Sequence, residues 1–128
     1  MASASNSVIK GNYAGHLIRY NGLDVVITRV TYYRDSLKVN SHNELPLNTS
    51  NVKQYEVITE ETWKSGSSAI LRGALGASVL GPLGLFAGFS AKNKGIYLIA
   101  IEWKDGQKSL IEIDEKKYQV LMRRLYRF

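Results

Sequence analysis

Few side chains in this sequence have the types and spacing that catalysis or metal binding requires. The two histidines, His16 and His42, are far apart, and the chain has no cysteine, so we expect no zinc site. The neighbouring carboxylates Glu60 and Glu61 fall in an expected turn, where adjacent side chains point apart and form no acid–base pair. The sequence therefore predicts a protein that is not an enzyme and that uses no metal ion or cofactor.

Basic residues at the two ends of an uncharged segment are the stronger chemical signal. Residues 73–91 carry no charge. Arg72 precedes this stretch, and Lys92 and Lys94 follow it. Cationic side chains near the free N–H groups of a helix start would favour an anion such as a phosphate. Aromatic rings could stack on a base, although Trp103 also fits a role in core packing. The candidate ligand-binding residues are Arg72, Lys92, Asn93, Lys94, Tyr97 and Trp103.

The distribution of charge favours the same half of the chain. Residues 1–64 hold seven lysines and arginines against six aspartates and glutamates, whereas residues 65–128 hold ten against five. The formal net charge is +6, so an electrostatic preference for anions is expected in the second half. A basic surface that serves only solubility would give the same pattern.

The segment 66–92 is an insertion rich in glycine and alanine, and three structures are compatible with it. A membrane-spanning helix needs about 20 apolar residues, but Pro82 and the glycines weaken that interpretation. A phosphate-cradling loop would lack the standard glycine–lysine–hydroxyl motif. The main expectation is a pair of short helices broken at Gly81-Pro82, roughly Ser67–Leu80 and Leu83–Lys92.

Small residues in this segment would let the two helices approach each other, a sheet face or a second copy of the chain. Glycine costs a helix about 1 kcal/mol per residue, so such helices need tertiary packing to form. The expected packing or oligomer contacts are Gly73, Ala77, Gly84, Phe86, Gly88 and Phe89.

The first part of the chain predicts a β-hairpin. Asn-Gly is a typical type I′ turn, so Asn21-Gly22 should join the strands Asn12–Tyr20 and Leu23–Tyr33. A two-residue loop sets Arg19 opposite Asp24, and a cross-strand pair of opposite charges supports that register.

The next part predicts shorter strands and turns. A turn at Arg34-Asp35 should lead into a short strand near Leu37–Val39, followed by a polar loop over Ser41–Asn51. A strand at Val52–Thr59 and an acidic turn at Glu60–Lys64 complete this half.

The clearest hairpin is Lys94–Lys104 with Gln107–Ile113 around the turn Asp105-Gly106. A two-residue loop sets Trp103 opposite Lys108. One face then carries Ile96, Leu98, Ala100, Ile111 and Ile113, and the other carries Tyr97, Ile99, Ile101, Trp103 and Leu110. A sheet with one solvated face should alternate more cleanly. We therefore expect both faces to be covered, one of them by the glycine-rich segment.

An amphipathic helix is predicted at Glu115–Arg127, with Asp114 as its N-cap. The apolar residues Tyr118, Leu121, Met122 and Leu125 share one helical face. The basic residues on the remaining surface are Lys116, Lys117, Arg123, Arg124 and Arg127.

A family resemblance rests on the following residues: Leu45-Pro46-Leu47, Val52, Tyr55-Glu56-Val57-Ile58, Arg72-Gly73-Ala74, Gly81-Pro82-Leu83-Gly84, Lys92-Asn93-Lys94, Tyr97-Leu98-Ile99, Asp105-Gly106 and the closing helix. Over about residues 45–128 this order of parts resembles small bacterial and phage domains of the pleckstrin-homology-like type. The resemblance implies a strongly bent antiparallel sheet capped by one C-terminal helix, in a binding module without catalytic residues. The glycine-rich insertion departs from a minimal fold of that type.

Together these features predict one α+β domain over residues 1–128, with residues 1–7 frayed and a glycine-rich helical hairpin inserted in a bent sheet. The expected function is capture of an anionic, phosphate-bearing ligand. The resemblance extends this to a phage-encoded cytoplasmic protein that sequesters a host nucleotide signal. The alternative is an assembly module, homo-oligomeric or associated with a membrane surface, that acts through the glycine-rich hairpin. No nucleic-acid-binding motif is present, so specific nucleic-acid recognition is not expected.

Overall fold

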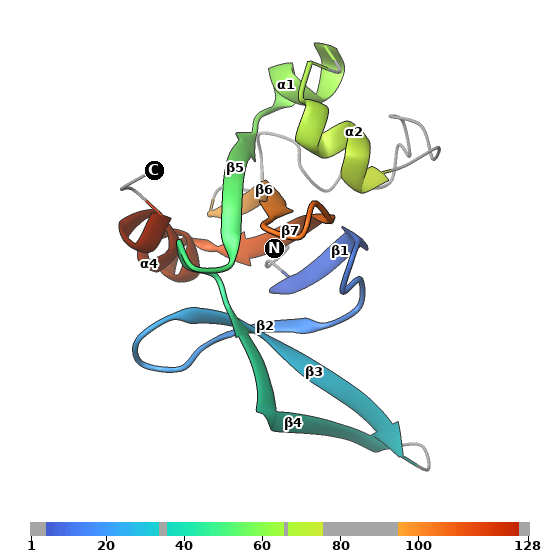
Figure 1. Ribbon diagram of the computed structural model, residues 1–128, viewed down its shortest axis with the longest axis vertical. Helices are drawn as coiled ribbons and strands as arrows, with labels where there is room; N and C mark the ends of the chain where they lie inside the picture. Colours follow the sequence, from blue (N-terminus) through green and yellow to red (C-terminus); the bar gives the residue numbers. More distant parts are fainter. Residues whose placement is uncertain (1–4, 34–35, 66, 76–94, 126–128) are drawn as a thin grey trace.

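The computed structural model describes residues 5–33, 36–65, 67–75 and 95–125, whose arrangement is shown in Figure 1. The described strands form one seven-stranded sheet in which all neighbours are antiparallel, in the order β4-β3-β2-β1-β7-β6-β5. The strands are β1 (Ser7–Gly11), β2 (Leu17–Tyr20), β3 (Val25–Tyr33), β4 (Ser36–Pro46), β5 (Val52–Ile58), β6 (Ile96–Trp103) and β7 (Lys108–Asp114). The helices are α1 (Glu60–Ser65), α2 (Ala69–Leu75) and α4 (Glu115–Leu125).

The sheet is strongly curled, and chain connectivity explains why. Its two edge strands, β4 and β5, are joined by residues 47–51. In a flat sheet of seven strands these edges would lie about 29 Å apart, whereas five extended residues reach at most about 18 Å. The backbone N–H of Leu47 donates to Val25 O, and that of Lys104 donates to Asn51 O. The connection is therefore held against both halves of the sheet. The expected bent antiparallel α+β sheet with a C-terminal helix is confirmed.

Each face of the sheet has its own apolar core. The α4-side core comprises Val8, Ile18, Val25, Ile27, Leu47, Val52, Ile99, Ile101, Trp103, Ile111, Ile113, Leu121 and Leu125. The α2-side core comprises Ile58, Trp63, Ile70, Leu71, Ala74, Leu75, Leu98, Ala100 and Leu110. Helices α4 and α2 lie on opposite sides of the β6–β7 hairpin (Figure 1). The prediction that both faces of this hairpin are covered is confirmed.

Helix α2 is the cover over the second face, and it belongs to the first helix expected at Ser67–Leu80. Ser68 is buried and caps the helix, because its hydroxyl accepts the N–H of Leu71 at 3.1 Å. The helix packs on β7, β6, β1 and β5. The residues predicted for the second helix and its break, and the contacts predicted at Ala77, Gly84, Phe86, Gly88 and Phe89, lie outside the described residues.

The register predicted for the second hairpin is wrong by one residue. Glu102, and not Trp103, pairs with Lys108. The loop has three residues, since Gly106 N–H donates to Trp103 O, Trp103 N–H donates to Gln107 O, and Gly106 has a φ of 88°. A slip of one residue moves the side chains of one strand to the other face. Ile111 and Ile113 therefore join the α4-side core.

The register predicted for the first hairpin is wrong by two residues, so each side chain keeps its predicted face. Tyr20 pairs with Val25, and Arg19 pairs with Val26 instead of Asp24. The loop spans four residues because the side chain of Asn21 accepts the N–H of Leu23 and of Asp24. This local hydrogen bonding replaces the expected type I′ turn.

Three further predictions for the first half are wrong. Residues 7–11 form β1, which pairs with both β2 and β7, so the predicted fraying does not extend to Ser7. Residues 41–46 belong to β4, in which residues 44–46 pair with β3, and are not part of a polar loop. The predicted acidic turn is helix α1, capped by the Thr59 hydroxyl, which accepts the N–H of Thr62. Glu60 and Glu61 fall in its first turn, where carboxylates favour a helix.

The C-terminal helix is confirmed over the described residues. Leu121 and Leu125 are fully buried, and Tyr118 and Met122 pack beside them, as the periodicity predicts. Asp114 is the N-cap: its Oδ1 accepts the N–H of Lys117 at 2.9 Å. Among the described residues no helix has the length and apolar character needed to span a membrane.

The cap makes a pH-dependent contribution to stability. Partial burial acts to raise the pKa of Asp114, but hydrogen bonds and the charge of Lys117, together with a hydrogen bond from Asn6, outweigh it and lower the pKa. The unfolded chain thus binds this proton more readily. The stabilisation is complete above the unfolded-state pKa and is lost as the pH falls through the folded-state pKa.

We expect Asp114→Asn to remove this contribution while keeping an N-cap acceptor. Urea denaturation should show the variant less stable than the wild type at neutral pH. The difference should shrink as the pH falls below about 4, because the wild-type carboxyl becomes protonated there. A difference of constant size down to the lowest pH would contradict this role.

Candidate functional site

A polar groove lies where α2 crosses the end of the β6–β7 hairpin. It has a volume of about 450 Å³. We call it the hairpin-end groove. The described residues that line it are Gly11, Asn12, Gly73, Gly106, Gln107 and Lys108. They come from the end of β1 and the residue after it, from α2, and from the β6–β7 loop with the start of β7.

Close backbone contact forms one wall of this groove. Gly11 has a φ of 85°, and a Cβ atom built on it would lie 2.3 Å from the carbonyl oxygen of Lys108. The N–H of Asn12 donates to that same oxygen at 2.8 Å. The Ser109 hydroxyl donates to Asn12 O at 2.5 Å and accepts the indole N–H of Trp103 at 2.8 Å. The wall is therefore anchored in the α4-side core.

The side chain of Lys108 crosses the groove and lies against Gly73. A Cβ atom on Gly73 would be 2.2 Å from Lys108 Cδ, so glycine leaves the space that the lysine occupies. The ammonium group is 3.4 Å from Gly106 O and 4.0 Å from Glu102 Oε2. Both distances are at the long end for such contacts, and the side chain is 30% exposed. The charge of Lys108 is accordingly held in place but open to an incoming anion.

The carboxylate nearest to the groove is already shared. Glu102 is buried, and its Oε1 accepts a hydrogen bond from the side-chain amide of Gln54. Its Oε2 lies 3.9 Å from Lys53 Nζ as well as 4.0 Å from Lys108 Nζ. One carboxylate thus faces two lysines. Arg72 is exposed on α2 and precedes the groove residue Gly73 in the sequence.

The structure does not gather the predicted ligand-binding residues at one site. Arg72 precedes Gly73 on α2, and Gly73, which was predicted as a packing contact, lines the hairpin-end groove. Tyr97 is at the opposite end of the hairpin, where it pairs with Ile113 and stacks on Tyr118 at 3.9 Å between ring centroids. Lys92, Asn93 and Lys94 lie outside the described residues.

The stacking role predicted for Trp103 is wrong. Its side chain is 3% exposed and belongs to the α4-side core. Its ring packs edge-on against Tyr13 at 5.6 Å. The alternative role in core packing is the correct one, because strand alternation puts Trp103 on the face of β6 that carries Ile99 and Ile101, and that face is covered by the α4-side core.

Sequence reasoning missed Lys108, Asn12 and Gln107 as groove residues. Nothing in the sequence around Lys108 indicates that a helix more than thirty positions away crosses it. The contact between Lys108 and Gly73 follows from how α2 packs on the hairpin, which only the tertiary structure gives.

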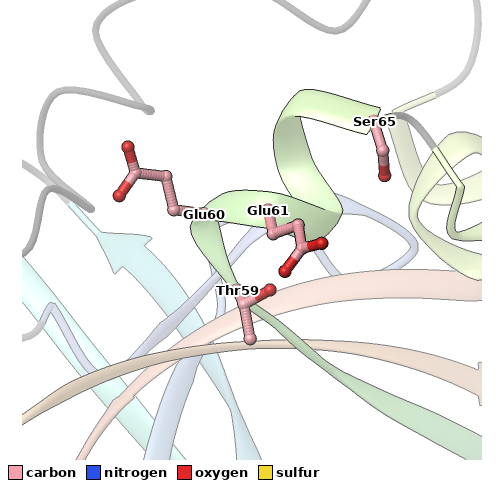
Figure 2. A pocket seen from close by; sticks show the side chains of 4 residues that line it. All are labelled: Thr59, Glu60, Glu61 and Ser65. Carbon is pink, nitrogen blue, oxygen red and sulfur yellow. The ribbon is translucent and has the colours of Figure 1, made fainter.

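The acidic pair at α1 lines a separate, open hollow together with Thr59 and Ser65. In Figure 2 the side chains of Glu60 and Glu61 extend in different directions from the helix and do not converge. His16 packs edge-on against Tyr13 at 6.1 Å. Within residues 5–33, 36–65, 67–75 and 95–125 no group of three or more potential metal ligands is found.

Comparison with protein-family models, with curated proteins and with solved structures gives no match.

Proposed function

We propose that this chain is a non-catalytic binding protein that captures a small phosphate-bearing anion at the hairpin-end groove. The observation that carries the proposal is the ammonium group of Lys108, held by two long contacts in a polar groove. An ammonium in such a position can form a short, charge-assisted hydrogen bond with a phosphate oxygen. The groove volume of about 450 Å³ is within the range of ligand sites.

The donors available to the anion are side chains. The backbone N–H groups of Asn12, Gly106 and Gln107 already donate to Lys108 O, Trp103 O and Asp105 Oδ1. A cradle of backbone amides is therefore not the basis of the proposal. Lys108, Arg72 and the side-chain amide of Asn12 are the groups that we expect to contact phosphate.

The resemblance to pleckstrin-homology-like domains is part of this proposal. A bent antiparallel sheet with a C-terminal helix is compatible with that class. Binding modules of this type act without catalytic residues. This agrees with the proposal that the hairpin-end groove binds an anion without transforming it.

Calorimetric titration with pyrophosphate and a set of nucleoside di- and triphosphates tests the proposal. We expect Lys108→Ala to weaken binding about tenfold or more, because a hydrogen bond to a charged group is lost. Lys53→Ala is the matched control, since it removes the same charge next to the same Glu102 carboxylate but outside the groove. It should change the affinity less than about twofold.

Gly73→Ala separates groove geometry from charge. Its methyl group would displace the flexible end of Lys108, while alanine favours a helix by about 1 kcal/mol over glycine. We expect unchanged or slightly higher stability together with weaker anion binding. Absence of binding to the wild type, or equal losses in Lys108→Ala and Lys53→Ala, would refute the proposed site.

A further inference from the structure

A second surface lies at α4, on the other side of the sheet from the hairpin-end groove. A groove runs between the β2–β3 turn and the C-terminal half of this helix. We call it the turn–helix groove. Its described lining residues are Tyr20, Gly22, Leu23, Val120, Arg123 and Arg124. Tyr20 and Leu23 are large hydrophobic side chains that are exposed, at 51% and 63%.

These exposed side chains are carried by a turn that is firmly held. Asn21 Oδ1 accepts the N–H of Leu23 at 2.9 Å and that of Asp24 at 2.8 Å. The guanidinium of Arg124 donates to Leu23 O at 2.9 Å and lies 2.9 Å from Asp24 Oδ1. The Tyr20 hydroxyl donates to Gly22 O at 3.0 Å. A partner would therefore meet preorganised apolar groups, which lowers the entropic cost of binding.

Some basic residues of α4 are already paired with carboxylates, and others are not. Arg124 is paired with Asp24, and Lys117 is paired with Asp114. Lys116 and Arg123 are exposed, and their side chains make no hydrogen bond or ion pair with the described residues. This leaves two positive charges facing outward from α4.

The two exposed basic residues of α4 lie on the same face of the helix as Val120, which lines the turn–helix groove. Lys116, Val120 and Arg123 are at positions i, i+4 and i+7, which lie on one helical face. Seven residues of α-helix span about 10 Å along the axis. That length corresponds to about three residues of an extended chain.

We propose that the turn–helix groove binds an extended acidic segment of a partner protein. An apolar side chain of the segment packs against Tyr20, Leu23 and Val120. Two carboxylates, three residues apart, pair with Arg123 and Lys116. Charge complementarity selects this partner: the protein carries a net charge of +6, so a negatively charged segment is attracted before contact. The proposal is independent of anion capture, because a phosphate would gain nothing from an apolar contact with Leu23.

Fluorescence anisotropy on the full chain tests this docking site. The probe is a fluorescein-labelled peptide with the sequence Asp-Leu-Phe-Asp between Gly-Ser ends. We expect the wild type to bind it, and Leu23→Ser and Arg123→Glu each to weaken binding about tenfold or more. Leu23 is exposed in a loop and Arg123 is exposed on α4, so both variants should fold. Lys53→Glu makes the same change of charge on β5 and should leave the affinity within about twofold.

Two altered peptides identify the chemistry that is recognised. Replacing both aspartates by asparagine should reduce binding, and so should replacing leucine and phenylalanine by serine. Failure of the wild type to bind the first peptide overturns the proposal. So does tight binding of a labelled DNA duplex that depends on Arg123 but is insensitive to Leu23→Ser, because a polyanion surface would then be the better description.

Discussion

Replacing Leu71 by alanine is expected to lower the free energy of unfolding by about 3 kcal/mol. Leu71 is fully buried in the α2-side core, between α2 and the face of the hairpin that carries Leu98 and Leu110. Alanine removes buried methyl groups and leaves a cavity under a helix of only seven residues. Such a helix depends on tertiary packing for its stability. Domains have about 5–15 kcal/mol of total stability, so this loss would be a large fraction.

Chemical denaturation monitored by circular dichroism measures the effect. Ala69→Ser on the exposed side of the same helix is the control, and it should cost about 0.5 kcal/mol or less. If both variants lost equally little stability, α2 would not be the cover that the hairpin face requires. Sheet-wide protection from hydrogen exchange should also decrease in Leu71→Ala, most strongly in β6 and β7.

Gly11→Ala should be comparably damaging, at about 3 kcal/mol or more, because two costs add at one position. The residue has a φ of 85°, a conformation that costs a non-glycine residue about 1–2 kcal/mol. A Cβ atom would also meet the carbonyl oxygen of Lys108 at 2.3 Å. That oxygen belongs to the backbone of β7 and accepts the N–H of Asn12, so it has little freedom to move. The β1–β7 pairing would have to distort.

Gly15→Ala is the matched control for this prediction. Gly15 has a φ of 91° in the turn that follows β1, but nothing lies within 4 Å of a Cβ atom built there. It should lose about 1 kcal/mol from the backbone conformation alone. Thermal unfolding of the two variants then gives the cost of the clash as the difference. Equal losses would mean that β1 is free to shift away from β7.

Local sequence patterns were sufficient for the elements that depend on neighbouring residues. The apolar spacing from Tyr118 to Leu125 and the cap at Asp114 predicted α4 correctly, because capping and helical periodicity are local. The lack of polar alternation in β6 and β7 predicted a sheet covered on both sides. That inference needed only composition and the twofold repeat of a strand.

Strand registers were not readable in the same way. Asn21-Gly22 and Asp105-Gly106 both mark loops correctly, but the loop lengths are four and three residues. Side-chain hydrogen bonds at Asn21 and a left-handed Gly106 decide those lengths. In that four-residue loop Asp24 does not pair with Arg19 but with Arg124, which is a hundred positions away in sequence.

The amino-acid sequence by itself determined the C-terminal helix, the two apolar faces of the β6–β7 hairpin and the positive balance of charge, since each follows from residue types and short-range spacing. The bent sheet was expected from the family resemblance, and α1 and the full length of β4 were not predicted. Only the tertiary structure decided which residues form the hairpin-end groove, where Gly73 makes room for Lys108, and the turn–helix groove, which Leu23 and Val120 both line. The reason is physical: a groove is a contact between elements, and its residues are brought together by strand register and sheet curvature. Both depend on hydrogen bonds and packing between segments that are distant in the chain.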